Sequence, residues 1–251
     1  MKKLALIGIL LMAFGHLQAQ AQADSISSPR KAVEGEKAYT YFPSNYFIGN
    51  SSFSLPKGQG YYANTLLFFN DFYYGVTDHF SVGAGFVPFF LLGTDFNPIW
   101  VKAKWAYPLA DKFRISAGVS FLYALIFAVP AGENNLVFAF PFAGATYGTP
   151  HHNVSLNVHY GFLLNDLKNG STTPLFALST KQQITPRTHF MADLFFNSDI
   201  YDNFNVVGIV GMQTAFIGLS LDYGLMIPYF EGQEKLIGIP YVGVKIPFNL
   251  K

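Results

Sequence analysis

The stretch HNVSLNVHYGF, from His152 to Phe162, decides the fold class. From Val154 onward apolar residues alternate without a break with a second set, which comprises Ser155, Asn157, His159 and Gly161. A period of two is typical of a β-strand with one apolar and one wet face. A soluble β-sandwich would turn the apolar face into its core, whereas an outer-membrane barrel would turn it out toward lipid.

The first residues of the chain indicate export. Lys2 and Lys3 precede an apolar run over residues 4–14, and small residues recur at positions 19, 21 and 23. This pattern predicts a signal peptide over residues 1–23, cleaved after Ala21 or Ala23, because the run is shorter than the roughly 20 residues of a membrane-spanning helix. We expect a short periplasmic tail over residues 24–40 and an outer-membrane β-barrel over residues 41–251.

Composition favours a membrane barrel over a soluble domain. Hydrophobic residues make up 51% of the chain and charged residues 12%, against about 25% charged in a typical globular protein, and the mean hydropathy is +0.26. No later apolar run approaches the length of a spanning helix, which leaves a closed β-barrel as the structure that satisfies its backbone in lipid. The absence of cysteine excludes disulfides and a lipoprotein anchor. A nearly neutral charge balance gives no indication of nucleic-acid binding.

Short polar turns recur at intervals that fit a run of β-hairpins. They lie at residues 77–79, 110–112, 149–152 and 185–188, with a fifth expected near Gln213. Mostly longer connections alternate with them, as expected for a barrel with a periplasmic and an external rim. The segments between these breaks predict twelve strands, at residues 44–55, 60–76, 80–91, 98–109, 112–129, 135–148, 153–164, 174–184, 188–197, 204–212, 215–227 and 236–249. We therefore expect an all-β fold, an antiparallel up-and-down transmembrane barrel.

The alternation repeats in other predicted strands, notably over residues 113–123 and 217–225. The polar set is too rich in Gly and Ser for the outside of a soluble protein and suits a lumen. Aromatic residues gather beside the breaks, where a barrel meets the lipid headgroups. These observations place lipid on the Val154 face and the lumen on the Ser155 face, and a soluble periplasmic β-sandwich is the alternative.

Two motifs near the start of the expected barrel carry a resemblance to a known family. Residues 57–62 read Lys-Gly-Gln-Gly-Tyr-Tyr, and residues 74–83 read Tyr-Gly-Val-Thr-Asp-His-Phe-Ser-Val-Gly. Together they resemble an uncharacterised outer-membrane β-barrel family common in Bacteroidota. The resemblance implies a barrel in the outer membrane of a Gram-negative bacterium, and it implies no reaction and no site residues.

The sequence offers little for catalysis. It lacks the usual nucleophile-elbow, zinc and calcium-loop motifs, so we expect no cofactor, no metal and no catalytic residues. An outer-membrane lipid hydrolase, either a deacylase or a phospholipase, is the alternative, with His159 as its base. Ser155 and Asn157 share a strand face with His159, but residues two apart are separated by about 6.6 Å, too far for nucleophile-to-base contact. Ser179 from a neighbouring strand is the other candidate nucleophile.

Alternation assigns several charges to the lumen, and they define the candidate site: Lys102, Lys104, Arg114, His159, Asp193 and Asp222. A twelve-strand ring has a backbone diameter of about 24 Å, too wide for salt bridges across it unless the barrel is flattened. We therefore expect these charges to meet water or a neighbouring side chain. They suit a non-enzymatic narrow pore or binding barrel for small polar solutes, with outer-membrane lipid outside. The alternative is a lumen filled by side chains, for which Trp100, Phe195, Phe216 and Tyr241 are the candidates.

Overall fold

The computed structural model describes residues 41–93, 96–126, 136–164, 174–198, 204–230 and 237–249. The predicted signal peptide and periplasmic tail lie outside these residues, so both remain predictions. Within the described residues, no helix is long and apolar enough to cross a membrane.

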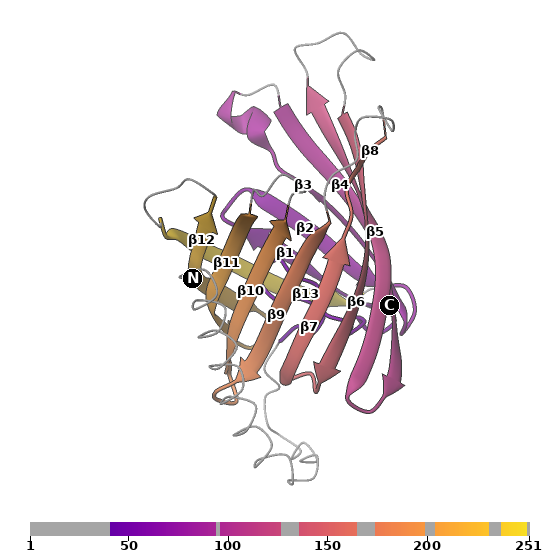
Figure 1. Ribbon diagram of the computed structural model, residues 1–251. Helices are drawn as coiled ribbons and strands as arrows, with labels where there is room; N and C mark the ends of the chain where they lie inside the picture. Colours follow the sequence, from indigo (N-terminus) through magenta and orange to yellow (C-terminus); the bar gives the residue numbers. More distant parts are fainter. Residues whose placement is uncertain are drawn as a thin grey trace. The chain divides into compact units, whose positions relative to one another are not determined.

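The strands form one closed antiparallel sheet (Figure 1). They are β1 (Gln59–Thr65), β2 (Phe69–Gly75), β3 (Phe80–Phe86), β4 (Phe96–Ala110), β5 (Phe113–Ile126), β6 (Leu136–Gly148), β7 (His152–His159), β8 (Phe162–Leu163), β9 (Leu175–Gln183), β10 (Thr188–Ser198), β11 (Phe204–Ala215), β12 (Ser220–Tyr229) and β13 (Ile239–Asn249).

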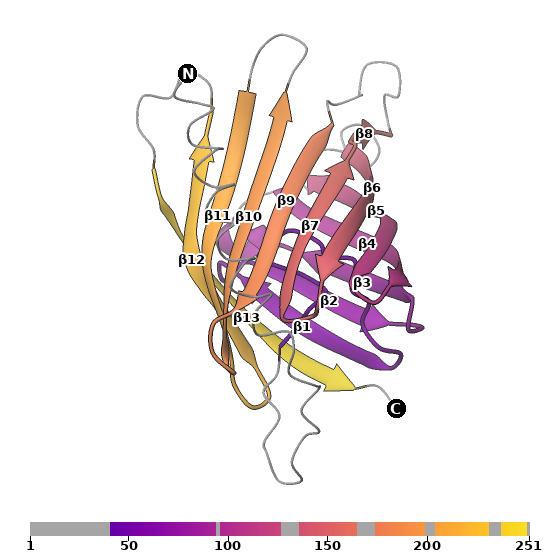
Figure 2. The same ribbon diagram turned by 60° about the horizontal axis from the view of Figure 1, so that its bottom comes forward.

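The ring closes because β1 pairs with both β2 and β13, while β5 pairs with both β4 and β6. The two-residue β8 pairs with β6 alongside β7, so the wall has twelve positions. The successive strands can be followed round the ring in Figure 2. The predicted antiparallel barrel of about twelve strands is confirmed, and a two-sheet sandwich does not fit a single closed sheet.

Two of the predicted strands are wrong, and the two errors cancel in the count. Residues 44–55 form no strand and make only an isolated bridge between Asn45 and Asn50. Residues 60–76 form two strands, β1 and β2, which pair with each other through a tight turn at residues 66–68. That turn contains Leu66 and Leu67 at positive φ, where Gly or Asn is the usual signal of a hairpin, so the sequence pattern conceals it.

The two faces of the wall differ as the alternation predicts. On β7 the side chains of Ser155 and Asn157 are each 1% exposed, whereas Leu156 between them is 54% exposed. On β12 Asp222 is buried and Leu225 is exposed. The polar residues therefore face the lumen, and the apolar residues form the outer surface.

The two ends of the barrel differ in their connections. Short turns at residues 76–79, 111–112, 149–151, 184–187 and 216–219 lie at one end, which we call the short-turn rim. Around this rim, exposed aromatic side chains lie near the ends of β4, β5 and β6, where Phe113 pairs directly with Tyr147 and Trp105 stacks on Tyr107. Such rings of aromatic residues are typical of the headgroup level of membrane barrels.

Candidate functional site in the barrel lumen

The lumen contains part of the chain itself, residues 41–56, which we call the luminal segment. Tyr41 lies beside His151 in one short turn, and the backbone N–H of Lys57 donates to Asp78 in another. Both ends of the segment are therefore at the short-turn rim. Between them the chain reverses in a turn, closed by a hydrogen bond from the N–H of Tyr46 to the carbonyl of Gly49 at 3.0 Å.

Three lysines of the wall hold the backbone of the luminal segment. Lys104 on β4, Lys181 on β9 and Lys245 on β13 each direct Nζ at its carbonyl oxygens. The contacts are from Lys104 to Ser44 (3.2 Å), Ser51 (3.2 Å) and Phe53 (2.9 Å), from Lys181 to Phe42 (2.6 Å) and Asn45 (3.0 Å), and from Lys245 to Tyr46 (3.1 Å). The segment has no strand partner for these carbonyls, so the ammonium groups replace the missing ladder bonds.

Asp193 on β10 binds the tip of the luminal segment. Its Oδ2 accepts hydrogen bonds from the backbone N–H groups of Ile48 at 2.8 Å and Gly49 at 2.9 Å. A Cβ atom at position 49 would lie 2.4 Å from Oγ of Ser179 and 2.8 Å from Oδ1 of Asp193. A side chain at this position would have to displace the Ser179 hydroxyl or the Asp193 carboxylate, so glycine suits the close approach of the tip.

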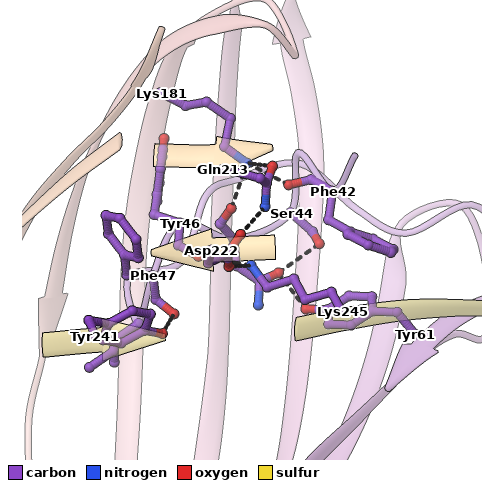
Figure 3. Close-up of polar contacts among 12 residues, drawn as sticks. Phe42, Ser44, Tyr46, Phe47, Tyr61, Lys181, Gln213, Asp222, Tyr241 and Lys245 are labelled. Carbon is purple, nitrogen blue, oxygen red and sulfur yellow. Dashed lines mark hydrogen bonds and ion pairs between the residues drawn. The ribbon is translucent and has the colours of Figure 1, made fainter. Parts of the chain in front are cut away.

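Buried polar side chains link two of these lysines, Lys181 and Lys245 (Figure 3). Asp222 forms a salt bridge with Lys245, with 2.8 Å between Oδ2 and Nζ. Gln213 donates from Nε2 to Oδ1 of Asp222 at 2.8 Å and accepts from Lys181 at its Oε1 at 3.2 Å. These contacts provide partners for one carboxylate and two ammonium groups inside the barrel, where an unpaired charge would be costly.

Tyr46 and Phe47 fill the space between the backbone contacts. The hydroxyl of Tyr46 donates to Oδ1 of Asn153 at 2.6 Å, and burial raises the pKa of this phenol well above its ordinary value, so it stays a donor. Phe47 packs edge-on against Tyr241, whose hydroxyl donates to the carbonyl of Phe47 at 3.0 Å. Phe47 thus belongs to a small apolar cluster with wall residues, namely Met191, Ile209 and Tyr241.

The returning limb of the segment contacts the other side of the wall. The N–H of Ser52 donates to Oγ1 of Thr146 at 2.7 Å, and its hydroxyl lies 2.9 Å from that of Ser116. Asn157 donates to the carbonyl of Asn50 at 2.8 Å. Contacts with strands all round the ring place the luminal segment inside the barrel.

The structure divides the predicted lumen charges among several partners. Lys104, Asp193 and Asp222 belong to the contacts above. The guanidinium of Arg114 lies 4.6 Å from the ring centre of Phe53 in the luminal segment. Lys102 instead contacts the wall, with Nζ 3.4 Å from Asp71 and 2.7 Å from the hydroxyl of Tyr73.

Among the described residues, the fold does not bring Ser179 within contact distance of His159. Its ring stacks on Phe142 with 5.4 Å between centroids, and its Nε2 has no hydrogen-bond partner in the described residues. It pairs with Leu175 on β9, and Ser179 lies four positions further, about 13 Å along the strand. The geometry therefore does not support a hydrolase that uses His159 and Ser179.

Sequence reasoning missed two of the three anchoring lysines and the luminal segment itself. Lys181 and Lys245 share strand faces with Ser179 and Tyr241, so the same alternation identifies them as inward-facing. Of the side chains expected to fill the lumen, Tyr241 is buried there. Phe216 lies instead in the turn between β11 and β12 and is 45% exposed. The prediction that Phe216 fills the lumen is wrong, because β12 begins at Ser220 and not at the predicted residue 215.

Two cavities lie between the luminal segment and the wall. One, of about 30 Å³, is lined by residues that include Leu55, Ser81, Lys102, Lys104 and Ser120. The other, of about 260 Å³, is open to the surface at the short-turn rim and is lined by residues that include Ser54, Pro56, His79, Ala106 and Arg114. The first has room for water molecules, and the second for a small solute.

Fold and lumen together define a small closed antiparallel β-barrel whose inner face binds a segment of its own chain. No family model and no curated protein matches the sequence. Among solved structures, the fold is similar to that of a KdgM porin, with a TM-score of 0.51 and 12% sequence identity over 76% of this chain and 99% of that chain. At this identity the similarity shows the fold.

Proposed function

We propose that the protein is an integral outer-membrane barrel of the porin type, non-enzymatic, through which small polar solutes pass in amounts that the luminal segment limits. The apolar outer face and the aromatic residues at the short-turn rim support a membrane location. The predicted signal peptide supports export to the outer membrane of a Gram-negative bacterium. The similar solved structure is named a porin, which supports solute passage as the class of function.

The observation that carries the proposal is the way in which the luminal segment is held. Three lysines and one aspartate bind its backbone, and both its ends lie at the short-turn rim. A segment held in this way narrows the lumen. Passage is therefore limited by the space beside the segment or by its displacement.

Planar-bilayer recording of the refolded protein tests the proposal. The comparison variant replaces residues 43–55 with a Gly-Ser linker of equal length, which keeps the chain length but removes the side chains that fit the lumen. We expect the native protein to conduct weakly and the linker variant to conduct several times more, because the lumen is then open. Heat-modifiable migration on a gel shows that each protein has folded as a barrel.

Two results would contradict the proposal. If neither protein conducts, the barrel is not a pore. If both conduct equally, the luminal segment does not limit passage. Recovery of the protein in the soluble periplasmic fraction, without detergent, would contradict the membrane location.

A further inference from the structure

The two cavities follow one another along the same part of the wall. Lys104 lines the first cavity and Ala106 the second, and these are consecutive inward positions on β4. On the luminal segment, Leu55 lines the first cavity and Pro56 the second. Beside the first cavity, the N–H of Leu55 donates to Oγ of Ser81 at 3.4 Å.

The charges along these cavities are mostly positive. Lys102 and Lys104 line the first and Arg114 the second. Asp71 lies 3.4 Å from Lys102 and partly neutralises it. Within the described parts of the chain, Lys104 and Arg114 have no carboxylate within ion-pair distance, since their contacts are to carbonyl oxygens and to the ring of Phe53.

The acidic groups nearby leave this balance positive. Asp78 also lines the second cavity, where one of its oxygens accepts the N–H of Lys57 at 2.9 Å. The other two luminal carboxylates, Asp193 and Asp222, lie on β10 and β12 and are occupied by the luminal segment and by Lys245. An excess of positive charge in a narrow, partly buried space attracts anions and repels cations.

The opposite side of the luminal segment is held more firmly. There Tyr46, Lys181 and Asp193 are almost fully buried, and none of them lines either of the two cavities. Movement that joins the two cavities therefore needs the returning limb, residues 51–55, to shift from β3, β4 and β5 and to release the contact of Ser52 with Thr146 on β6. The tip can stay bound to Asp193.

We propose that small anions cross the barrel along the β3, β4 and β5 side of the luminal segment, past Lys102, Lys104 and Arg114. This inference rests on the proposed porin function and assigns that function a route and a class of solute. The contacts of Ser52 with Ser116 and of Leu55 with Ser81 form the constriction on this route.

Thiol labelling tests the route directly, because the chain contains no cysteine. Ser120→Cys places one thiol in the first cavity, and Ser179→Cys places a matched thiol on the firmly held side, beside Gly49. Each variant, refolded in lipid vesicles and checked by heat-modifiable migration, is treated with an anionic sulfonatoethyl or a cationic trimethylammonioethyl methanethiosulfonate. We expect the Ser120→Cys thiol to react about tenfold faster with the anionic reagent, as electrostatic focusing predicts, and the Ser179→Cys thiol to react slowly with both.

The charge assignment is tested with Lys102→Gln and Arg114→Gln together, which leaves the anchoring Lys104 in place. This change should bring the two labelling rates at Ser120→Cys toward equality and should lower the anion preference measured as a reversal potential. Equal labelling at the two cysteine positions, or faster reaction with the cationic reagent, would overturn the route. If the Ser120→Cys thiol prefers the anionic reagent but the protein never conducts, the proposed porin function is wrong and the first cavity is only accessible to anions. This outcome is distinct from equal labelling at the two cysteine positions, which contradicts the route alone.

Discussion

The Nζ atom of Lys245 lies 2.8 Å from Oδ2 of Asp222, and their side chains are only 5% and 1% exposed. The pair joins neighbouring strands, β12 and β13, and Lys245 has a further hydrogen bond to the carbonyl of Tyr46. The salt bridge therefore both neutralises a buried carboxylate and orients an anchor of the luminal segment.

Removing one partner of this pair should destabilise the barrel strongly. Asp222→Asn leaves the Lys245 ammonium buried without a carboxylate, a change that typically costs about 3–5 kcal/mol. Lys245→Met should cost a similar amount, and the double variant should cost less than the sum because no buried charge is left unpaired. Urea unfolding in lipid vesicles measures these free energies, with Asp111→Asn in an exposed turn as the control. Additive effects would mean that the two side chains act independently.

Gly49→Ala should displace the tip of the luminal segment. The added methyl group would lie 2.4 Å from the Ser179 hydroxyl, and overpacking of this kind typically costs about 1–3 kcal/mol. The displaced tip would lose its hydrogen bonds to Asp193, so the luminal segment would fill the lumen less completely. We therefore expect a larger bilayer conductance together with the lower stability. Gly208→Ala is the matched control, since the nearest atom to a Cβ there is 3.9 Å away. Equal conductance in the two variants would show that the tip tolerates a side chain.

The alternation of residue types was sufficient to predict the two faces of the wall, because burial on a strand depends on parity alone. Ser155 and Leu156 differ by one position and have opposite environments. The same parity directs Lys104, Asp193 and Asp222 inward. What these charges bind was not predictable from the wall strands, since their partners are backbone atoms of a segment far away in the sequence.

Residues 44–55 of the luminal segment contain the aromatic and apolar residues that are typical of a strand, so the sequence pattern predicts one there. Its backbone groups are satisfied by Lys104, Asp193 and Thr146 instead of by a ladder, which is a tertiary property that local pattern does not carry. The apolar turn at Leu66 and Leu67 was missed for the opposite reason. There a hairpin exists without the Gly, Asn or Asp residues that usually mark one.

The contact of the luminal segment with the short-turn rim should weaken in acid. His151 lies 3.3 Å from the Tyr41 hydroxyl and 3.3 Å from Nε2 of His189, and its pKa is lowered by burial and then by the charges of His152 and Lys181. A lowered pKa means that the folded protein binds fewer protons than the unfolded chain. Stability is therefore complete above about pH 6.5 and falls as the pH drops from there through the lowered pKa.

Unfolding free energies at pH 7.5 and pH 5.0 measure this effect. The native protein should lose more stability between the two values than His151→Gln, which cannot titrate at this position. An equal loss in both proteins would assign the pH dependence to other groups, among which His189 is the nearest.

The outer face of β7 offers the sharpest test of the membrane location. Leu156 lies four positions from the start of β7, about 13 Å along the strand, and is 54% exposed. In an outer-membrane barrel Leu156→Arg should cost about 2–4 kcal/mol, because an arginine near the middle of the bilayer is poorly solvated. Ile217→Arg lies in a turn at the short-turn rim and is the control, since the cost near an interface falls to about 0–1 kcal/mol. In a soluble protein both residues would be ordinary surface positions, where substitutions change stability by at most about 0.5 kcal/mol. Urea titration in vesicles measures the free energy of unfolding of the two refolded variants. A lower value for Leu156→Arg than for Ile217→Arg supports the membrane location, and equal values would exclude lipid from the Leu156 face.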